Sequence, residues 1–135
     1  MERESVLEKK IYYHDTDAGG VVYYGNYLKH LEEARTEYCF ERGVDKRALA
    51  AAGILFVVAH LDIEYRAPAR YLDVVQVRTT VQKLGRSAVV FLQTVRRGTV
   101  VLVEAKVTAV CVGADFRARA LPPQIRAAFG ETAHA

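Results

Sequence analysis

Two aspartates, Asp15 and Asp17, lie in a glycine-bearing loop directly before the longest predicted helix of the chain. Backbone N–H groups in the first turn of a helix have no partner within the helix and carry a partial positive charge. They can bind an anion, or polarise a carbonyl oxygen that gains negative charge during acyl transfer. A carboxylate held beside that point can act as a nucleophile or activate a water molecule. Because Gly19, Gly20 and Gly25 have no side chains, the backbone here can approach a substrate closely.

The Asp-Thr-Asp pattern also has a purely structural explanation. Aspartate side chains before a helix commonly accept hydrogen bonds from nearby backbone N–H groups, which stabilises a turn or a helix start. On spacing alone, this structural role is favoured over a catalytic one for Asp15 and Asp17. Other residue types offer less: the four histidines are not spaced as metal ligands, and Ser87 has no nearby His and Asp to complete a triad.

Several further polar residues are expected in structural positions. Cys39 and Cys111 form no Cys-x-x-Cys motif, so neither a disulfide framework nor a cysteine-based zinc site is expected. Both thiols are predicted to be buried and unreactive. His60 lies in an alternating strand pattern and is predicted to be a packed or interface residue. Glu33 and Glu37 are predicted on a solvated or interface face of the helix.

The loop that carries Asp15 and Asp17 is called the aspartate loop below. The elements that position it follow from the periodicity of the sequence. Residues 6–13 suit a strand, with β-branched and aromatic residues between charges. The clearest helix covers residues 26–42, with Asn26 as its N-cap and Gly43 closing it. Its apolar residues recur at helical spacing, so one face should pack on a core. A second, short helix is predicted at 45–52.

The second half of the chain has the composition and period of strands. Strand-forming residues, separated by turn signals, fill the ranges 55–65, 73–84, 87–97 and 99–112. The last three strands are closely spaced and should form an antiparallel meander. Long apolar runs within them indicate burial on both faces, by the helix and by a partner subunit. A short helix is expected near 122–129, followed by a frayed tail at 130–135.

Length and composition indicate one folded domain, residues 1–135, of the α+β class, with one long helix against a curled five-stranded antiparallel sheet. Apolar residues make up 51% and charged residues 26% of the chain, as in a folded soluble protein. The net charge of +3 is too small to indicate nucleic acid as the main partner. The longest uncharged stretch is shorter than the roughly 20 residues of a transmembrane helix, and a cytoplasmic location is predicted.

The motif Tyr13-His-Asp-Thr-Asp-Ala-Gly-Gly-Val-Val-Tyr-Tyr-Gly-Asn-Tyr27 resembles the 4-hydroxybenzoyl-CoA thioesterase family, and within it the Tol-Pal-associated acyl-CoA thioesterase branch. The resemblance continues through 33–37, 63–70 and 85–93, so it covers nearly the whole chain. It implies a hotdog fold, in which a five-stranded antiparallel sheet wraps a central helix. It also implies hydrolysis of an acyl-CoA thioester without metal or cofactor, in a homodimer with active sites at its interface or in a homotetramer.

The resemblance further implies roles for individual residues. The family's catalytic aspartate falls on Asp17, as nucleophile or general base, and its polarising backbone amide falls on Tyr24 or Gly25. Tyr24 and Tyr27 are expected to shape the acyl pocket, with Asn26 as a further substrate-binding residue. Because CoA carries several phosphate charges, basic residues that flank turns are expected to contact it. These residues are Arg66, Arg70, Lys83 and Arg86.

Tyr24 leaves the acyl group open. The Tol-Pal branch often has His at this position, whereas the 4-hydroxybenzoyl enzymes have Tyr followed by Asn and Tyr, so the chain is compatible with a short aliphatic or an aromatic acyl group. Two other functions stay open: a non-catalytic acyl-CoA-binding or scaffold protein, and a hotdog hydratase or dehydratase. Dehydratase chemistry generally needs a His with a carboxylate, whereas the motif offers Asp followed by tyrosines. An association with envelope or lipid-synthesis proteins is also left open.

Overall fold

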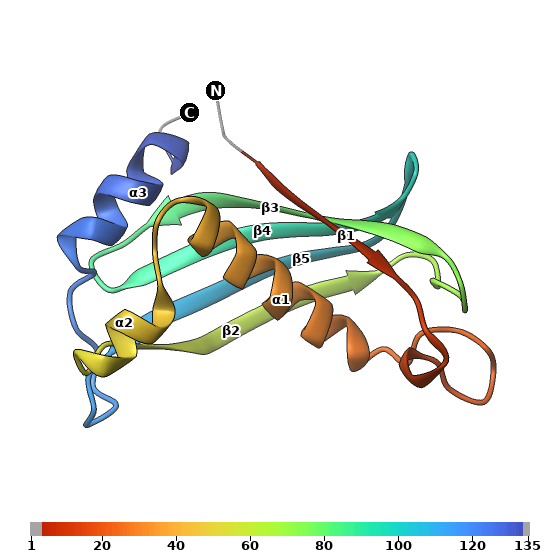
Figure 1. Ribbon diagram of the computed structural model, residues 1–135, viewed down its shortest axis with the longest axis horizontal. Coiled ribbons are helices and arrows are strands. Elements are labelled where there is room, and N and C mark those ends of the chain that lie inside the picture. Colours follow the sequence, from red (N-terminus) through yellow and green to blue (C-terminus); the bar gives the residue numbers. More distant parts are fainter. Residues whose placement is uncertain (1–3, 134–135) are drawn as a thin grey trace.

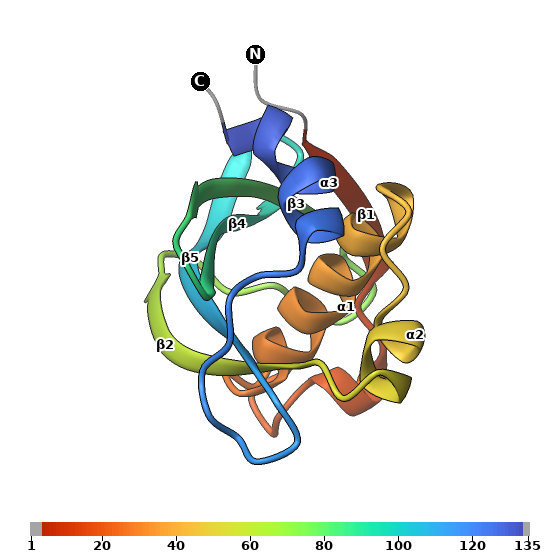
Figure 2. The ribbon, with the colours of Figure 1, turned by 90° about the vertical axis from the view of Figure 1, so that its left-hand side faces the viewer.

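The computed structural model describes residues 4–133, with side chains described for residues 4–130. Five strands form one antiparallel sheet in the order β1-β3-β4-β5-β2. Their bounds are β1 Ser5–Lys10, β2 Leu55–Tyr65, β3 Val74–Leu84, β4 Ala88–Arg97 and β5 Val100–Val112. The long helix α1, Asn26–Glu41, runs along the concave face of this sheet (Figure 1). Seen end-on, the strands curl around α1, which confirms the predicted α+β hotdog arrangement (Figure 2).

The sheet register follows the predicted meander. Strands β3, β4 and β5 pair consecutively, and β1 adds to β3 from Ser5 opposite Thr79 to Lys10 opposite Val74. Strand β2 pairs with β5, so β1 and β2 are the two edge strands of the sheet. All pairings are antiparallel, which places the end of β2, the start of β3 and the start of α1 at the same end of the molecule (Figure 1).

The first strand is shorter than predicted. It ends at Lys10 rather than at residue 13, and Tyr13–Asp15 forms a single turn of 3-10 helix. The backbone N–H of Ile11 donates to the Asp73 carbonyl at 2.8 Å, after which the chain turns away from the sheet. The Asp15 carboxylate accepts the Tyr12 N–H at 2.9 Å and closes this turn. The strand-like composition of residues 11–13 was therefore overridden by a side-chain hydrogen bond.

Helix α1 starts as predicted, but its cap differs. Gly25 is the N-cap and Asn26 is the first helical residue, so the prediction of Asn26 as N-cap was wrong. The Asn26 side chain points back to the loop instead, and its Nδ2 donates to the Asp15 carbonyl at 2.9 Å. At the other end, Gly43 has a φ of +78°, as expected for the residue that closes a helix. Asp45 caps the short helix α2, Lys46–Ala51, through the Arg47 N–H.

The C-terminal helix is longer than predicted. Helix α3 covers Pro123–Ala133, so the expectation of a frayed tail from Gly130 onward was wrong as far as Ala133. Ile125 and Phe129, four residues apart, are almost fully buried and hold the helix on the core. Residues 134–135 lie outside the described residues.

The core lies between α1 and the sheet. Tyr38 contacts Phe91 and Phe129 edge to face, with ring centroids 5.9 and 5.3 Å apart. Both Cys39 and Cys111 are buried, as predicted, and burial raises the pKa of each thiol. His60 is exposed on this chain, so packing within the chain was a wrong expectation and an interface position remains a prediction. Residues 4–133 contain no helix long and apolar enough to cross a membrane.

Candidate active site

Asp17 projects from a small hairpin between the 3-10 turn and α1. Its backbone N–H donates to the Val21 carbonyl at 2.9 Å, and its carbonyl accepts the Gly20 N–H at 3.0 Å. Gly20 has a φ of +77°, a conformation that side-chain-bearing residues rarely adopt, so this turn requires glycine. The Asp17 carboxylate is exposed at the tip of the hairpin, where a substrate can reach it.

Gly19 holds the Asp17 carboxylate in place. The Gly19 N–H donates to Asp17 Oδ1 at 2.8 Å, which fixes the side chain over its own turn. A Cβ on Gly19 would lie 3.2 Å from the same oxygen. The second oxygen of the carboxylate, Oδ2, accepts no hydrogen bond from the described residues and is free to face a substrate carbon or a water molecule.

The start of α1 offers two backbone donors. Tyr23 N–H donates to the Asp15 carbonyl at 3.1 Å, and Asn26 N–H donates to the Tyr23 carbonyl at 2.8 Å. Tyr24 and Gly25 lie between these two residues in the chain, and their N–H groups donate to no group within residues 4–133. They lie at the positive end of the helix dipole, where they can receive a carbonyl oxygen or an oxyanion. Tyr24 and Gly25 are the two positions at which the polarising amide is expected, and that role stays a prediction.

A hollow of about 250 Å³ lies beside these donors. Its lining comes from the end of the hairpin, from α1 and from the segment that follows β2: Val22, Tyr24, Tyr27, Tyr65, Arg66, Ala67 and Pro68. The Tyr65 hydroxyl donates to the Tyr24 carbonyl at 3.2 Å, and the rings of Tyr24 and Tyr27 lie 6.1 and 5.7 Å from the Tyr65 ring. Three aromatic rings and apolar neighbours make this hollow suitable for an acyl group.

Tyr27 is a fixed wall of the hollow. It is 3% exposed, and its hydroxyl accepts the Ala69 N–H at 2.9 Å. Burial is the main cause that raises the pKa of Tyr27, so its phenol stays neutral. Tyr65 was missed as a site residue by the sequence reasoning, although it lies within the segment 63–70 that carries part of the resemblance. Its position at the end of an edge strand gave no periodic signal.

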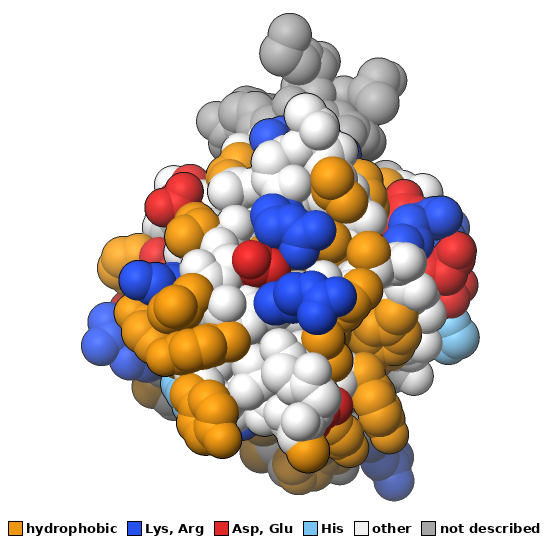
Figure 3. Space-filling model, turned by 90° about the vertical axis from the view of Figure 1, so that its right-hand side faces the viewer, with side chains coloured by type: hydrophobic (Ala, Val, Ile, Leu, Met, Phe, Trp, Pro, Cys, Tyr) orange, Lys and Arg blue, Asp and Glu red, His pale blue; other side chains and the backbone are white. Residues whose placement is uncertain are grey.

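Arg66 and Arg70, the two predicted phosphate-binding arginines near the hollow, differ in their surroundings. Arg66 is held by Glu104 and Glu64, and its hydrogen bond with Glu104 raises the pKa of the guanidinium. The Arg70 side chain is exposed and makes no hydrogen bond or ion pair with another described residue. Figure 3 looks onto this end of the molecule and shows basic side chains among hydrophobic ones. Arg70 is therefore better placed than Arg66 to bind an added anion.

Lys83 and Arg86 lie far from this group within the chain. Strand β3 runs from Val74, at the end of the molecule where α1 starts, to Leu84, a length of roughly 35 Å for its 11 residues. Lys83 and Arg86 stand at its far end, where the Arg86 carbonyl accepts the N–H of Leu121 near α3. One chain thus brings together Asp17, Tyr24, Gly25, Asn26, Tyr27, Arg66 and Arg70, and it leaves Lys83 and Arg86 apart. Within residues 4–133, no three His, Cys, Asp or Glu side chains are grouped to hold a metal ion.

The chain resembles known proteins in sequence. Residues 12–129 match the thioesterase-like superfamily. The acyl-CoA thioester hydrolase YbgC of Escherichia coli is 40% identical over 122 residues, which cover 89% of this chain and 91% of the relative. The acyl-CoA thioesterase YbgC of Haemophilus influenzae is 38% identical over 122 residues, with coverages of 89% and 90%.

Solved structures resemble the chain in fold. A hypothetical protein from Thermus thermophilus superimposes with a TM-score of 0.89 at 34% identity, over 95% of this chain and 98% of that chain. A mutant 4-hydroxybenzoyl-CoA thioesterase complexed with 4-hydroxybenzoyl-CoA superimposes with a TM-score of 0.87 at 22% identity, over 94% and 99% of the two chains. At that identity, the second match is evidence for the fold alone.

Proposed function

The chain belongs to the thioesterase-like superfamily, and on this premise we propose that it hydrolyses the thioester of a short-chain or aromatic acyl-CoA to the free acid and CoA. The observation that carries the proposal is the arrangement at the start of α1. An exposed Asp17 carboxylate, held by the Gly19 N–H, shares a short loop with two backbone N–H groups that have no partner among the described residues. The relatives named as acyl-CoA thioester hydrolases support the same reaction class.

In the proposed mechanism, the thioester carbonyl oxygen accepts hydrogen bonds from the N–H groups of Tyr24 and Gly25. Asp17 either attacks the carbonyl carbon or removes a proton from a water molecule that attacks it. Negative charge that develops on the oxygen is stabilised at the helix start. The C–S bond then breaks, and CoA leaves as a thiolate or, after taking up a proton, as a thiol. If Asp17 attacks, water hydrolyses the resulting anhydride and regenerates the carboxylate.

The substrate is proposed to span the hollow and the basic surface beside it. The acyl group enters the hollow against Tyr24, Tyr27 and Tyr65. The CoA phosphates contact Arg70, with Arg66 at the rim. Lys83 and Arg86 would reach a phosphate only from another copy in a homodimer or homotetramer. Action as a single domain over residues 1–135, and a cytoplasmic location, are further parts of this proposal.

The hydratase alternative receives less support from the side chains present. The chain does hold a histidine next to a carboxylate, since His30 Nε2 lies 3.5 Å from Asp15 Oδ1. However, His30 is 5% and Asp15 6% exposed, so a substrate does not reach the pair. The exposed acid of the loop is Asp17, which has no histidine partner among the described residues.

Release of free thiol from a panel of acyl-CoAs tests the proposal. The panel runs from acetyl-CoA to palmitoyl-CoA and includes benzoyl-CoA and 4-hydroxybenzoyl-CoA. We expect wild type to turn over at least one of them, and Asp17→Asn to lower kcat by at least about 100-fold. Asp115→Asn is the matched control, because Asp115 makes a similar bond, to the Arg117 N–H, in an exposed turn elsewhere. If wild type and Asp17→Asn both bind CoA esters without turnover, the protein is a binder and the proposal fails.

A further inference from the structure

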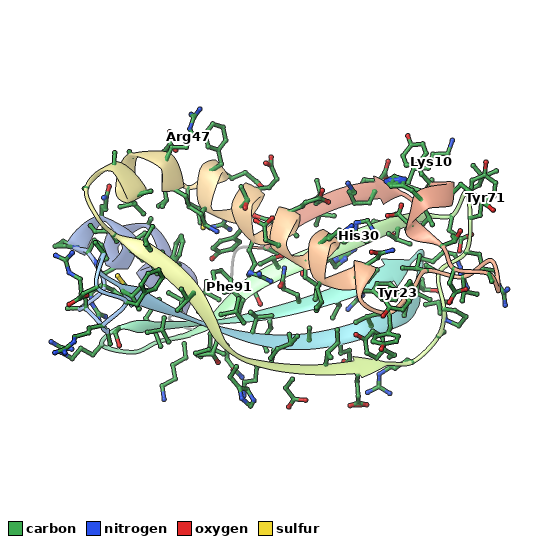
Figure 4. All side chains as sticks on the ribbon, turned by 90° about the horizontal axis from the view of Figure 1, so that it is seen from below. Lys10, Tyr23, His30, Arg47, Tyr71 and Phe91 are labelled. Atoms are coloured by element: carbon green, nitrogen blue, oxygen red, sulfur yellow. The ribbon has the colours of Figure 1, made fainter. Side chains whose placement is uncertain are left out.

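A buried Asp–His pair lies beneath the aspartate loop. Asp15 is 6% exposed although most of its loop neighbours are exposed, and His30, on α1, is 5% exposed. His30 Nε2 lies 3.5 Å from Asp15 Oδ1. Neither ring nitrogen of His30 has a hydrogen-bond partner of good geometry among the described residues. Figure 4 shows His30 and Tyr23 toward the same end of α1.

A second carboxylate faces the other side of the imidazole. His30 Nδ1 lies 3.6 Å from Glu33 Oε1, and Glu33 is paired in turn with Lys9 on β1 at 2.8 Å. Partial burial raises the pKa of the Glu33 carboxyl, but the hydrogen bond and charge of Lys9, together with His30, lower it overall. Each ring nitrogen of His30 therefore lies within 3.6 Å of a carboxylate oxygen, one from the loop and one from α1 itself.

Asp15 connects this pair to the loop that carries Asp17. Its Oδ2 accepts the Tyr12 N–H at 2.9 Å, at the start of the loop. Its carbonyl accepts the Tyr23 N–H at 3.1 Å and Asn26 Nδ2 at 2.9 Å, where the loop ends and the helix begins. One buried residue therefore joins both stems of the hairpin to the first turn of α1. Movement of Asp15 would change where Asp17 stands relative to the N–H groups of Tyr24 and Gly25.

We propose that Asp15 and His30 are positioning residues for the hydrolysis. The His30 ring, between Asp15 and Glu33, holds the Asp15 carboxylate, and Asp15 sets the place of the Asp17 loop against the helix start. The inference rests on the proposed function of Asp17. It assigns to His30 a role through Asp15 and not a contact with substrate. A displacement of about 1 Å in such a site can cost roughly 100-fold in rate, so even a small release of the loop should be measurable.

The kinetic test uses variants of similar size that remove the Asp15 carboxylate or the His30 imidazole. Asp15→Asn and His30→Gln are each expected to lower kcat roughly 10- to 100-fold, with KM within about 3-fold of wild type. The double variant should fall no further than the larger single effect, because both changes break one interaction. Asp115→Asn should match wild type. Melting curves by circular dichroism verify that each variant is folded at the assay temperature.

Glu33→Gln keeps the proposal testable if the variants of the buried pair fail to fold. The Glu33 side chain is 46% exposed, and its replacement leaves the buried pair intact. It is expected to lower kcat by a smaller factor, roughly 2- to 5-fold, with KM unchanged. If Asp15→Asn, His30→Gln or Glu33→Gln is folded and keeps wild-type kcat, or if the losses fall on KM alone, the positioning role is overturned.

A spectroscopic experiment tests the contact between Asp15 and His30 without measuring turnover. In a ¹H–¹⁵N spectrum of the histidine rings, the His30 resonances are those lost in His30→Gln. They are expected to shift in Asp15→Asn, while those of His60, exposed on β2, stay in place. Unmoved His30 resonances would overturn the inference even if kcat falls. A wild-type protein that hydrolyses no acyl-CoA would overturn the proposed function and the positioning role with it, whereas an active wild type with unaffected variants overturns the positioning role alone.

Discussion

Tyr27→Phe tests the hydrogen bond that joins α1 to the segment after β2, beside the hollow. The Tyr27 hydroxyl accepts the N–H of Ala69, which is fully buried in the segment between β2 and β3. The Ala69 carbonyl in turn accepts the Val22 N–H at 2.8 Å, and Val21 forms an isolated bridge with Arg70. Ala69 therefore joins the aspartate loop to the turn that carries Arg70, and Tyr27 holds Ala69 from inside.

The expected cost follows from the geometry. Phenylalanine fills nearly the same volume as tyrosine, so no large cavity forms, but the Ala69 N–H loses its acceptor in a place that water does not reach. A buried donor left without a partner costs about 1–3 kcal/mol. For a chain of 135 residues, a middle value of about 2 kcal/mol corresponds to a fall in Tm of roughly 6–10 °C.

Thermal unfolding and amide hydrogen exchange measure this prediction. Tyr71→Phe is the matched control, because Tyr71 is 50% exposed and its hydroxyl has no hydrogen bond to another described residue; its Tm should change by less than about 2 °C. The Ala69 amide should lose protection in Tyr27→Phe and keep it in Tyr71→Phe. Equal Tm values for the two variants, with the Ala69 amide still protected, would refute the reasoning.

The remaining predictions concern the charged groups of the same end. Arg70→Ala should raise KM for acyl-CoA more than Arg66→Ala, because Arg66 is already paired with Glu104 and Glu64 while Arg70 is unpaired among the described residues; kinetics at low and high salt check this, and an equal effect of both would contradict it. Partial burial raises the pKa of Asp73, but the Arg70 N–H and the Arg97 guanidinium lower it overall, below its ordinary value. The stability that Asp73 contributes is therefore fully present above the ordinary carboxyl pKa of about 3.9, and it is lost as the pH falls from there through the lowered pKa of the folded state. Asp73→Asn should lower Tm at pH 7 and lower it less at pH 3; a constant difference across this range would exclude the linkage.

The strands were predictable because their signals are local. Alternation, β-branched residues and turn dipeptides set the bounds of β2 through β5 to within one residue of the structure. The misplaced ends have non-local causes. Residues 11–13 leave the sheet because Asp15 captures the Tyr12 N–H, and α3 continues past Gly130 because Ile125 and Phe129 anchor it in the core. The contact between Asp15 and the Tyr12 N–H has no periodic signature in the sequence.

The site divides in the same way. Asp17, Tyr24 and Gly25 were identified from one continuous motif, and the structure places them on one loop and one helix start. Arg70 joined them because the turn after β2 meets the loop through the Val21 bridge. Lys83 and Arg86 were grouped with Arg70 on charge alone, but an 11-residue strand separates them within the chain. A charged residue at a strand end indicates that its side chain is solvated. Only the topology shows at which end of the molecule that side chain lies.

His30 illustrates what a sequence pattern cannot supply. A histidine among apolar helix positions is compatible with a core residue, a metal ligand or a surface residue, and the residue that faces it, Asp15, is fifteen positions away in a loop. Their contact exists because α1 starts directly where the hairpin ends, with Asn26 turned back onto the Asp15 carbonyl. The same Asp15 was read from the sequence as half of a carboxylate pair, yet its burial separates it from Asp17 in chemical terms. One aspartate faces the solvent and is available for chemistry, and the other is inside and sets where the first one stands.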